Sequence, residues 1–408
     1  MCGIVGILNL KDHPPAEQGT LRQMLEMIRH RGPDGFGIYR GEHAALGSAR
    51  LSIIDLSGGD QPIGNEDGSQ WIVFNGEIFN YVELRPQLEA HGHRFSTNTD
   101  TEVILHLYEE YGHNCLNYLN GQFAIAIWDM RKQSLFLARD RFGVRPLFYT
   151  VHDGRLIFGS EIKAILAHPG MRAEIDPIAL NQIFTFWSAL SPRSVFRDII
   201  EIPPGHYLQA QDGAFTLHPY WSLDLMPESS SERPPQDYLD ELESLLIDAT
   251  RIRLRADVPV GAYLSGGLDS STTTAIIRKY TNARLDTFSI SFTDSPEFDE
   301  SQFQRQMANY LGTDHQVVEC NHADIGRVFP DVVWHTETPV LRTSPAPMFL
   351  LSKLVNDCHF KVVVTGEGAD EFLAGYDIFK EAQVRRFWAR DPDSQRRPLL
   401  LRRLYPDI

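Results

Sequence analysis

The chain has 408 residues, of which 42% are hydrophobic and 23% are charged, a globular composition with room for two or three cores. Aspartate and glutamate number 54 against 38 lysines and arginines, and the net charge of -16 argues against nucleic acid or an anionic membrane as a partner. The sequence also lacks an apolar run of about 18 residues, so we expect no membrane span and favour small soluble substrates.

The chain contains four cysteines, Cys2, Cys115, Cys320 and Cys358. They show no short paired spacing, so neither a disulfide framework nor a zinc site is indicated. The N-terminus lacks the basic region and apolar core of a signal peptide, and we therefore expect the protein in a reducing cytoplasm.

The chain begins Met-Cys-Gly-Ile-Val-Gly, which makes Cys2 the first candidate catalytic residue. Removal of Met1 would place a thiol and an α-amino group on the same residue. The pKa of an α-amino group is about 7.7–8.0, so part of it is neutral at physiological pH. It can then serve as the base for the nucleophilic side chain of the same residue. From the dipeptide alone, a chance cysteine in an apolar first strand is the simpler explanation.

From residue 1 to about 220, short β-rich runs alternate with glycine turns, as at residues 71–76 and 123–129. One clear helix is predicted at residues 101–111, where apolar side chains recur at helical spacing. This pattern predicts an α+β sandwich. A stretch rich in serine, proline and charge follows, and we place a domain linker at residues 221–236.

The second domain, predicted at residues 237–408, alternates helices with apolar strands. This alternation predicts a doubly wound parallel sheet, with ligands at the carboxyl ends of its strands. The predicted helices are 237–254, 270–280, 300–311 and 347–357, and the predicted strands are 258–264, 286–292 and 361–365.

Residues 264–271 read Leu-Ser-Gly-Gly-Leu-Asp-Ser-Ser and lie between a predicted strand and a predicted helix. The glycines allow the backbone to approach an anion, the serine hydroxyls add donors, and the helix N-terminus adds partial positive charge. Asp269 suits such a phosphate site if Mg²⁺ lies between the carboxylate and the phosphates. A common serine-glycine turn with a helix cap is the alternative, but the flanking strand and helix favour nucleotide binding.

The loop has no lysine and so differs from the common P-loop; it resembles the S-G-G-x-D-S loop of the ATP pyrophosphatases. Those enzymes activate a carboxylate or carbonyl as an adenylate. A second motif, Thr-Gly-Glu-Gly-Ala-Asp-Glu at residues 365–371, follows another strand-like run. Three carboxylates beside glycines at a strand end indicate a metal and acid/base site rather than a solvated acidic turn.

Further motifs occur in order along the chain, at residues 1–6, 29–34, 50–55, 75–81, 100–102, 139–149, 158–164 and 203–206. Together with the two motifs of the second domain, they make the chain similar to the glutamine-dependent asparagine synthetases. The resemblance implies an α+β N-terminal-nucleophile glutaminase domain with an αββα sandwich. It also implies a following α/β ATP-pyrophosphatase domain, of the adenine nucleotide alpha hydrolase-like type, that performs the synthetase reaction.

The resemblance implies a class II glutamine amidotransferase site with Cys2 as its nucleophile. Hydrolysis of the glutamine amide passes through a tetrahedral oxyanion, which needs hydrogen-bond donors fixed where the charge develops. In the family, the residues that match the Asn75 side chain and the Gly76 backbone N–H fill that role.

The amino-acid end of glutamine needs a cation for its carboxylate and anions for its ammonium group. The resemblance gives the first role to Arg50 and the second to Glu77 and Asp100. Simpler roles would be a surface ion pair for Arg50 and a helix N-cap for Asp100. Backbone groups at four positions would complete this pocket: Leu51, Ser52, Ile53 and Ile54.

For the second domain the resemblance implies that ATP adenylates the side chain of aspartate, and that ammonia then displaces AMP to give asparagine. By similarity, the nucleotide would be contacted by Leu264, Ile290, Ser265, Gly266, Gly267, Asp269, Ser270, Thr365 and Gly366. Mg²⁺ would be bound by Asp269 and Asp370. Glu367 would act in adenylate formation or take a proton from ammonia.

Members of the family continue past the acidic motif into a helical remainder with a lysine-containing stretch, which this sequence lacks. We therefore expect the chain to be a fragment. The alternatives are a glutaminase whose truncated ligase domain is inactive, a related amidotransferase that acts on another carboxylate, and a noncatalytic sensor. The resemblance also allows a homodimer.

Overall fold

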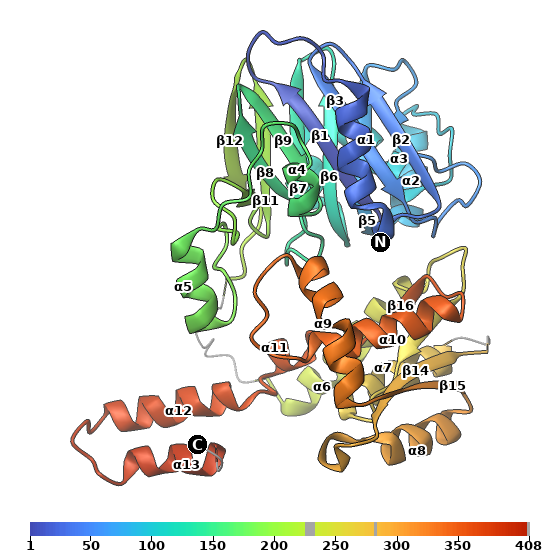
Figure 1. Cartoon of the computed structure of the whole chain (residues 1–408). Helices are drawn as coiled ribbons and strands as arrows, with labels where there is room; N and C mark the ends of the chain where they lie inside the picture. The colour runs from blue at the N-terminus through green and yellow to red at the C-terminus, as the bar shows by residue number, and fades with distance from the viewer. Residues whose placement is uncertain (225–232, 281–283, 406–408) are drawn as a thin grey trace. The chain divides into compact units, whose positions relative to one another are not determined.

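The computed structural model describes residues 1–224, 233–280 and 284–405, which form two compact units (Figure 1). The first unit contains Met1–Pro259 and Cys320–Val362, and the second contains Val260–Glu319 and Val363–Ile408. Much of the predicted linker, at residues 225–232, lies outside the described residues. The domain boundaries at 220 and 237 therefore remain a prediction.

The first unit is built on two six-stranded sheets whose paired strands run antiparallel. Across the first sheet, the strands are β10 (Ile200–Glu201), β8 (Phe148–His152), β9 (Arg155–Gly159), β1 (Gly3–Asn9), β3 (Ala44–Arg50) and β2 (Gly35–Arg40). Across the second, they are β12 (Ala214–Pro219), β11 (His206–Gln211), β7 (Ser134–Arg139), β6 (Gly121–Asp129), β5 (Gln70–Ile78) and β4 (Ile63–Gly64).

Three apolar clusters hold these sheets and their helices in four layers. Strand β1 shows the principle: Ile4 and Leu8 pack between the sheets, whereas Val5 and Ile7 face the opposite side. That opposite side is covered by α1 (Gln18–Met27) and α4 (Ile162–Leu166), and the outer face of the second sheet by α2 (Tyr81–Ala90) and α3 (Asp100–Tyr111). The predicted αββα sandwich is confirmed (Figure 1).

The remaining helices of the first unit are η1 (Arg29–Arg31), η2 (Gly112–Asn117), α5 (Pro177–Phe186), α6 (Pro235–Ile252), α9 (His322–Thr336) and α10 (Pro345–Asp357). The predicted runs at 71–76, 123–129 and 101–111 fall within β5, β6 and α3. The prediction of one clear helix before residue 220 is wrong, because α1, α2, α4 and α5 also form. Helix α2 contains Pro86, which normally breaks a helix, and α4 has only 5 residues, too few for a periodic pattern.

The second unit contains a four-stranded sheet in the order β15 (Asp314–Cys320), β14 (Asp286–Phe292), β13 (Val260–Tyr263) and β16 (Val362–Val364). Strands β13 and β14 run parallel, as predicted, and β15 adds a strand that the sequence pattern did not indicate. The helices are α7 (Leu268–Tyr280), α8 (Ser301–Leu311), α11 (Ala369–Leu373), α12 (Asp377–Ala389) and α13 (Leu401–Leu404), with short turns η3 (Pro296–Phe298) and η4 (Arg397–Leu400). Helix α7 follows β13 and packs against it.

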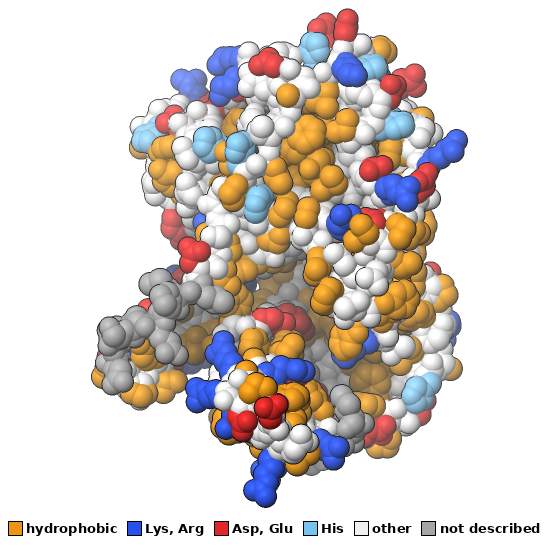
Figure 2. Space-filling view, turned by 90° about the vertical axis from the view of Figure 1, so that its left-hand side faces the viewer, with side chains coloured by type: hydrophobic (Ala, Val, Ile, Leu, Met, Phe, Trp, Pro, Cys, Tyr) orange, Lys and Arg blue, Asp and Glu red, His pale blue; other side chains and the backbone are white. Residues whose placement is uncertain are grey.

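On the face drawn in Figure 2, acidic and basic side chains are interspersed with apolar ones, in a chain whose net charge is -16. Among the described residues, no helix has both the length and the apolarity needed to cross a membrane.

A buried carboxylate organises the turn that follows β7. Asp140 is 1% exposed, and its Oδ1 accepts hydrogen bonds from the backbone N–H groups of Phe142 (3.1 Å) and Val144 (3.0 Å). Its Oδ2 accepts from the N–H groups of Phe123 (3.2 Å) and Arg145 (3.0 Å). Four donors on one carboxylate fix the backbone of this turn, and with it the position of Arg145.

We expect Asp140→Asn to destabilise the first unit by about 1–3 kcal/mol, because the new amide NH₂ would face backbone donors and leave them unpaired. Thermal unfolding should show a melting temperature several degrees lower. Asp153→Asn is the matched control, since Asp153 lies exposed in the β8–β9 turn at φ 48°, a conformation that asparagine tolerates. Equal melting temperatures for the two variants would contradict this role of Asp140.

Candidate active site

A pocket opens in the first unit at the start of β1. It combines a thiol, two amides, two arginines and two carboxylates. Its lining residues are Met1, Cys2, Arg50, Leu51, Ile53, Ile54, Gly59, Gln61, Phe74, Asn75, Gly76, Glu77, Thr99, Asp100, Thr101 and Arg145. The structure thus brings together nearly all residues predicted for the glutaminase site.

Cys2 is held from both sides at the entrance to β1. Its Sγ accepts a hydrogen bond from the N–H of Leu51 (3.3 Å) and lies 3.6 Å from the Leu51 carbonyl oxygen. Its own carbonyl accepts from Arg31 Nε (3.0 Å), and Arg31 also pairs with Glu161 (2.8 Å). These contacts fix the orientation of a potential nucleophile.

Burial at the chain terminus disfavours the charged forms of the Cys2 thiol and the Met1 amine. Removal from water raises the pKa of the Cys2 thiol. The same burial lowers the pKa of the Met1 α-amino group from 8.0 to about 5, and the guanidinium groups of Arg31 and Arg145 act in the same direction. An amine at this position is therefore neutral at physiological pH and able to accept a proton.

Asn75 lies on β5 and is fully buried, yet neither its Oδ1 nor its Nδ2 has a hydrogen-bond partner within the described part of the chain. Buried amides are normally paired, because an unpaired one costs about 1–3 kcal/mol. This amide lines the same pocket as Cys2. It is therefore available to a ligand, as an oxyanion donor would be.

The next residue must be glycine for β5 to pair with β6. A Cβ on Gly76 would lie 2.0 Å from the carbonyl oxygen of Gln122 and 2.8 Å from the Cα of Phe123. Strand pairing at this point thus requires a residue without a side chain. Both Gly76 and Asn75 line the pocket.

Arg50 ends β3 and is only 6% exposed. Its guanidinium donates to Asp60 Oδ1 (2.8 Å) and to the carbonyl oxygens of Ile54 (3.2 Å) and Asp55 (2.6 Å). Arg50 therefore makes the ion pair that was considered from sequence, and its partner, Asp60, is exposed. Its presence does not exclude a role in binding, since Arg50 also lines the pocket.

Asp100 occupies the first position of α3, whereas the N-cap is Thr99, whose hydroxyl accepts from the N–H of Glu102 (3.2 Å). The N-cap role considered for Asp100 is therefore filled by its neighbour. Burial raises the pKa of Asp100 to about 7; a hydrogen bond from the Ile78 N–H opposes this rise, and the nearby Glu77 adds to it. Burial also raises the pKa of Glu77. Two such carboxylates at one pocket favour the arrival of a cation.

Two residues depart from the sequence-based expectation for this pocket. Ser52 is not among the lining residues, and its N–H donates instead to Asp34 Oδ2 (2.8 Å). Arg145 lines the pocket, although the sequence analysis assigned it no role beyond membership of a motif. Its position depends on the turn around Asp140, which a sequence pattern does not reveal.

In the second unit, the predicted phosphate loop joins β13 to α7. Gly266 has φ +86°, which favours glycine, and a Cβ there would lie 2.8 Å from Phe303 Cβ. The hydroxyls of Ser265 and Ser270 lie 2.9 Å apart, and the Ser265 Oγ accepts from the N–H of Gly267 (3.2 Å). The loop is therefore compact, with its hydroxyl groups on the inside of the turn.

The acidic motif lies directly against this loop. A Cβ on Gly366 would be 3.0 Å from Asp269 Cβ and 3.1 Å from the Ser270 backbone nitrogen. The two motifs, separated by almost one hundred residues in sequence, thus meet at the carboxyl ends of β13 and β16, where a parallel sheet binds ligands. A glycine cradle with carboxylates beside it has the donor types that nucleotide phosphates and Mg²⁺ require.

The other predicted residues of this site are distributed around the two motifs. Leu264 is buried, and its N–H donates to the carbonyl oxygen of Phe288 (3.0 Å). Ile290 lies on β14, where its carbonyl accepts from Gln304 Nε2 (2.9 Å). Thr365 Oγ1 accepts a hydrogen bond from the backbone N–H of Glu367, and the Glu367 residue is exposed. Asp370 lies in the first turn of α11.

Comparison with known proteins matches two family models in order along the chain. A family model described as a glutamine amidotransferase domain matches residues 1–221, and one described as asparagine synthase matches residues 241–407. Asparagine synthetase [glutamine-hydrolyzing] 1 of Bacillus subtilis (strain 168) is 35% identical over 405 residues, which are 98% of this chain and 63% of that protein. Asparagine synthetase [glutamine-hydrolyzing] 3 of the same organism is 36% identical over 94% of this chain and 64% of its own length.

Another relative carries a different name. Amidase chry2 of Gibberella zeae is 35% identical over 93% of this chain and 60% of its own length. The chain thus spans slightly less than two thirds of each of these three relatives. With both family models matched in order along it, the chain belongs to the family of glutamine-hydrolysing asparagine synthetases.

Proposed function

We propose that the chain is a glutamine-dependent asparagine synthetase that releases ammonia from glutamine at Cys2 and uses it to amidate aspartate at an ATP-dependent site. The observation that carries the first half is the unpaired, fully buried Asn75 amide, which lines one pocket with Cys2. No role in the fold accounts for this amide. A developing oxyanion would supply its missing acceptor.

In this proposal, removal of Met1 frees an α-amino group on Cys2 itself. That amine takes the thiol proton, and the sulfur adds to the amide carbon of glutamine. The Asn75 side chain and the Gly76 N–H stabilise the oxyanion while the C–N bond breaks and ammonia leaves with a proton from the amine. Water then hydrolyses the thioester to give glutamate. Burial lowers the pKa of the Met1 amine, and the same surroundings would favour the neutral form of an amine on Cys2, which is the form that accepts a proton.

The remaining pocket residues would bind the amino-acid end of glutamine. Arg50 would hold the carboxylate, while Asp100 and Glu77 would hold the ammonium group. Backbone groups from Leu51 to Ile54 would border the substrate, although Ser52 faces away toward Asp34. The raised pKa of Asp100 supports this assignment, because an ammonium group would stabilise the ionised carboxylate.

For the second half, ATP would activate the side-chain carboxylate of aspartate as β-aspartyl-AMP with release of pyrophosphate, and ammonia would then displace AMP. The contact between the Ser265–Ser270 loop and Gly366 supports this assignment. Asp269 and Asp370 would hold Mg²⁺, which neutralises phosphate charge when bound. Leu264, Ile290 and Thr365 would surround the nucleotide, and Glu367 would act as the acid or base.

The acceptor is the least constrained part of the proposal, because a relative named as an amidase is 35% identical to this chain. AMP formation measured with aspartate and with a panel of other carboxylates would distinguish these acceptors. A cytoplasmic location, supported by four free cysteines, remains a prediction. A homodimer also remains a prediction.

We expect Cys2→Ala to abolish glutamate release from glutamine, a loss on the order of a thousandfold or more, because the nucleophile is removed. Synthesis from added ammonium should continue, since it needs only the second site. Glutamate and AMP formation measured separately will check both statements. Cys358→Ala is the control, and an equal loss of both activities in Cys2→Ala would contradict separate sites.

Asn75→Ala should lower kcat for glutamine hydrolysis by about 10²–10³-fold, as expected for loss of one oxyanion donor. The melting temperature should change little, because this side chain makes no hydrogen bond within the described fold. Steady-state kinetics combined with thermal unfolding will test the assignment. A variant with normal kcat, or one that loses stability in proportion to activity, would argue against it.

The affinity for glutamine should depend on the ionisation of Asp100, whose pKa is about 7. Only the carboxylate pairs with ammonium, so KM should rise as the pH falls through 7 and level off above it. Asp100→Asn should raise KM at every pH and flatten this dependence. Asp153→Asn should keep the wild-type profile, and an unchanged KM profile in Asp100→Asn would refute the assignment.

A further inference from the structure

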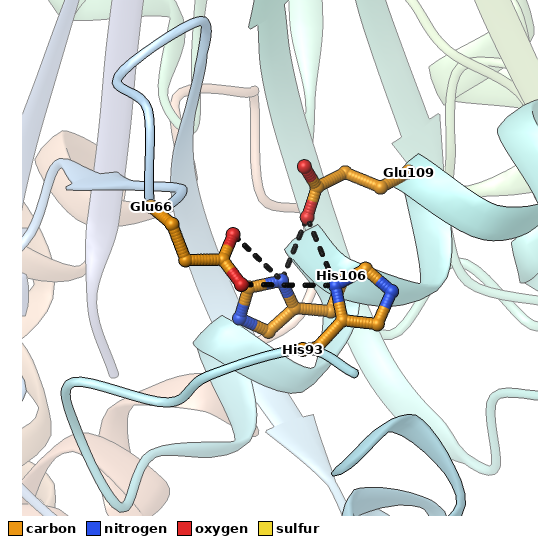
Figure 3. A group of neighbouring side chains, drawn as sticks. All are labelled: Glu66, His93, His106 and Glu109. Carbon is orange, nitrogen blue, oxygen red and sulfur yellow. Dashed lines mark hydrogen bonds and ion pairs between the residues drawn. The ribbon is translucent and has the colours of Figure 1, made fainter. Parts of the chain in front are cut away.

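Four side chains outside the pocket converge on one point of the first unit: Glu66, His93, His106 and Glu109 (Figure 3). Each offers one ligand atom, and these atoms all lie within 4.8 Å of one another. Glu66 comes from the loop between β4 and β5, His93 from the segment after α2, and the other two from α3. The group therefore joins three segments of the fold.

The distances between these atoms are close to those around a bound metal ion. Glu109 Oε2 lies 2.7 Å from His106 Nδ1 and 3.5 Å from His93 Nδ1. Glu66 Oε2 lies 3.9 Å from His106 Nδ1, and Glu66 Oε1 lies 3.9 Å from His93 Nδ1. Ligands 2.0–2.2 Å from a tetrahedral zinc ion are about 3.4 Å apart, so small side-chain rotations would close the site.

Both histidines face carboxylates on their other ring nitrogens. His93 Nε2 lies 2.9 Å from Glu110 Oε1, and His106 Nε2 lies 3.7 Å from Glu102 Oε1. In metal sites such carboxylates fix the tautomer that presents the opposite nitrogen to the ion. Here that opposite nitrogen is Nδ1 in both rings, and both Nδ1 atoms face the centre of the group.

The two carboxylates are oriented in the same way. Glu109 Oε1 accepts a hydrogen bond from Asn65 Nδ2 (2.7 Å), which leaves Oε2 toward the histidines. Glu66 Oε1 accepts from the backbone N–H of Arg94 (2.9 Å). Glu66, His93 and Glu109 are therefore positioned by hydrogen bonds from a second layer. His106 Nε2 has only the longer contact with Glu102 and no hydrogen bond among the described residues.

Hydrogen bonds and ion pairs among these side chains alone are the simpler explanation. They would leave Glu66 3.9 Å from both Nδ1 atoms, too far for a hydrogen bond. One divalent cation would instead satisfy both neutral Nδ1 atoms and balance the two carboxylates. Two nitrogen and two oxygen ligands suit zinc and related transition metals better than Mg²⁺ or Ca²⁺.

We propose that Glu66, His93, His106 and Glu109 form a structural site for one divalent transition-metal ion, with zinc as the best match. Its ligands are graded in exposure, from 0% for the His106 side chain to 38% for that of Glu66, which gives the ion a route of entry. A bound ion would link α3 to the β4–β5 loop and to the segment that follows α2. The inference does not depend on the proposed function.

The test uses the full chain carrying Cys2→Ala, because a thiol next to an amino group chelates zinc by itself. Protein stripped with EDTA is given one equivalent of Zn²⁺, passed through a desalting column and analysed for metal. We expect one zinc ion per chain, and a melting temperature about 5 °C or more above that of the stripped protein when free zinc greatly exceeds its Kd. The visible absorption of Co²⁺ should indicate tetrahedral coordination with nitrogen and oxygen ligands.

Glu66→Gln and His93→Gln, made at the more accessible positions, should each weaken zinc binding on the order of a hundredfold and abolish the gain in melting temperature. His91→Gln is the matched control: His91 is exposed and near Glu110 but belongs outside the four-residue group, and this variant should bind zinc normally. Failure of the stripped chain to retain zinc would overturn the proposal. So would normal zinc binding by both ligand variants, which would place the ion elsewhere.

Discussion

The pairing of β1 with its two neighbours is the constraint on which the first unit depends. In the register with β3, Gly3 lies opposite Ala49, so Cys2 is brought to Arg50 and Leu51 by backbone hydrogen bonds alone. On its other side β1 pairs with β9, and its side chains pack on both faces of the sheet. A shift of one residue would exchange these faces, and burial on both sides therefore fixes where the thiol lies.

The pocket is assembled from groups that the fold leaves incompletely satisfied. Asn75 is buried without a hydrogen-bond partner among the residues that the structure describes, and Asp100 is buried with a raised pKa. Two nearby side chains, in contrast, are well bonded: the carboxylate of Asp140 accepts four backbone donors, and Arg50 donates to three acceptors. Such fixed contacts allow a few polar groups to remain unpaired until a ligand arrives.

Much of the fold and pocket could be predicted from sequence, but the reasons differ. Strands such as β5 and β6 are apolar runs bounded by glycine, and the helix at α3 shows clear periodicity, so local physics was enough. Cys2 was a candidate from its position after Met1, whereas Asn75 and Asp100 were assigned by resemblance to a family. Arg145 and the group around His106 could not be found, because a turn and a tertiary contact between separate segments place them. The second unit's site residues remain predictions.

The central position of β1 also determines when the pocket around Cys2 can exist during synthesis. Its partner β9 ends at Gly159, so β1 is synthesised well before this partner strand is complete. Contacts of such long sequence separation form late in folding. A nascent chain therefore holds its cysteine without a surrounding pocket until most of the sandwich has left the ribosome.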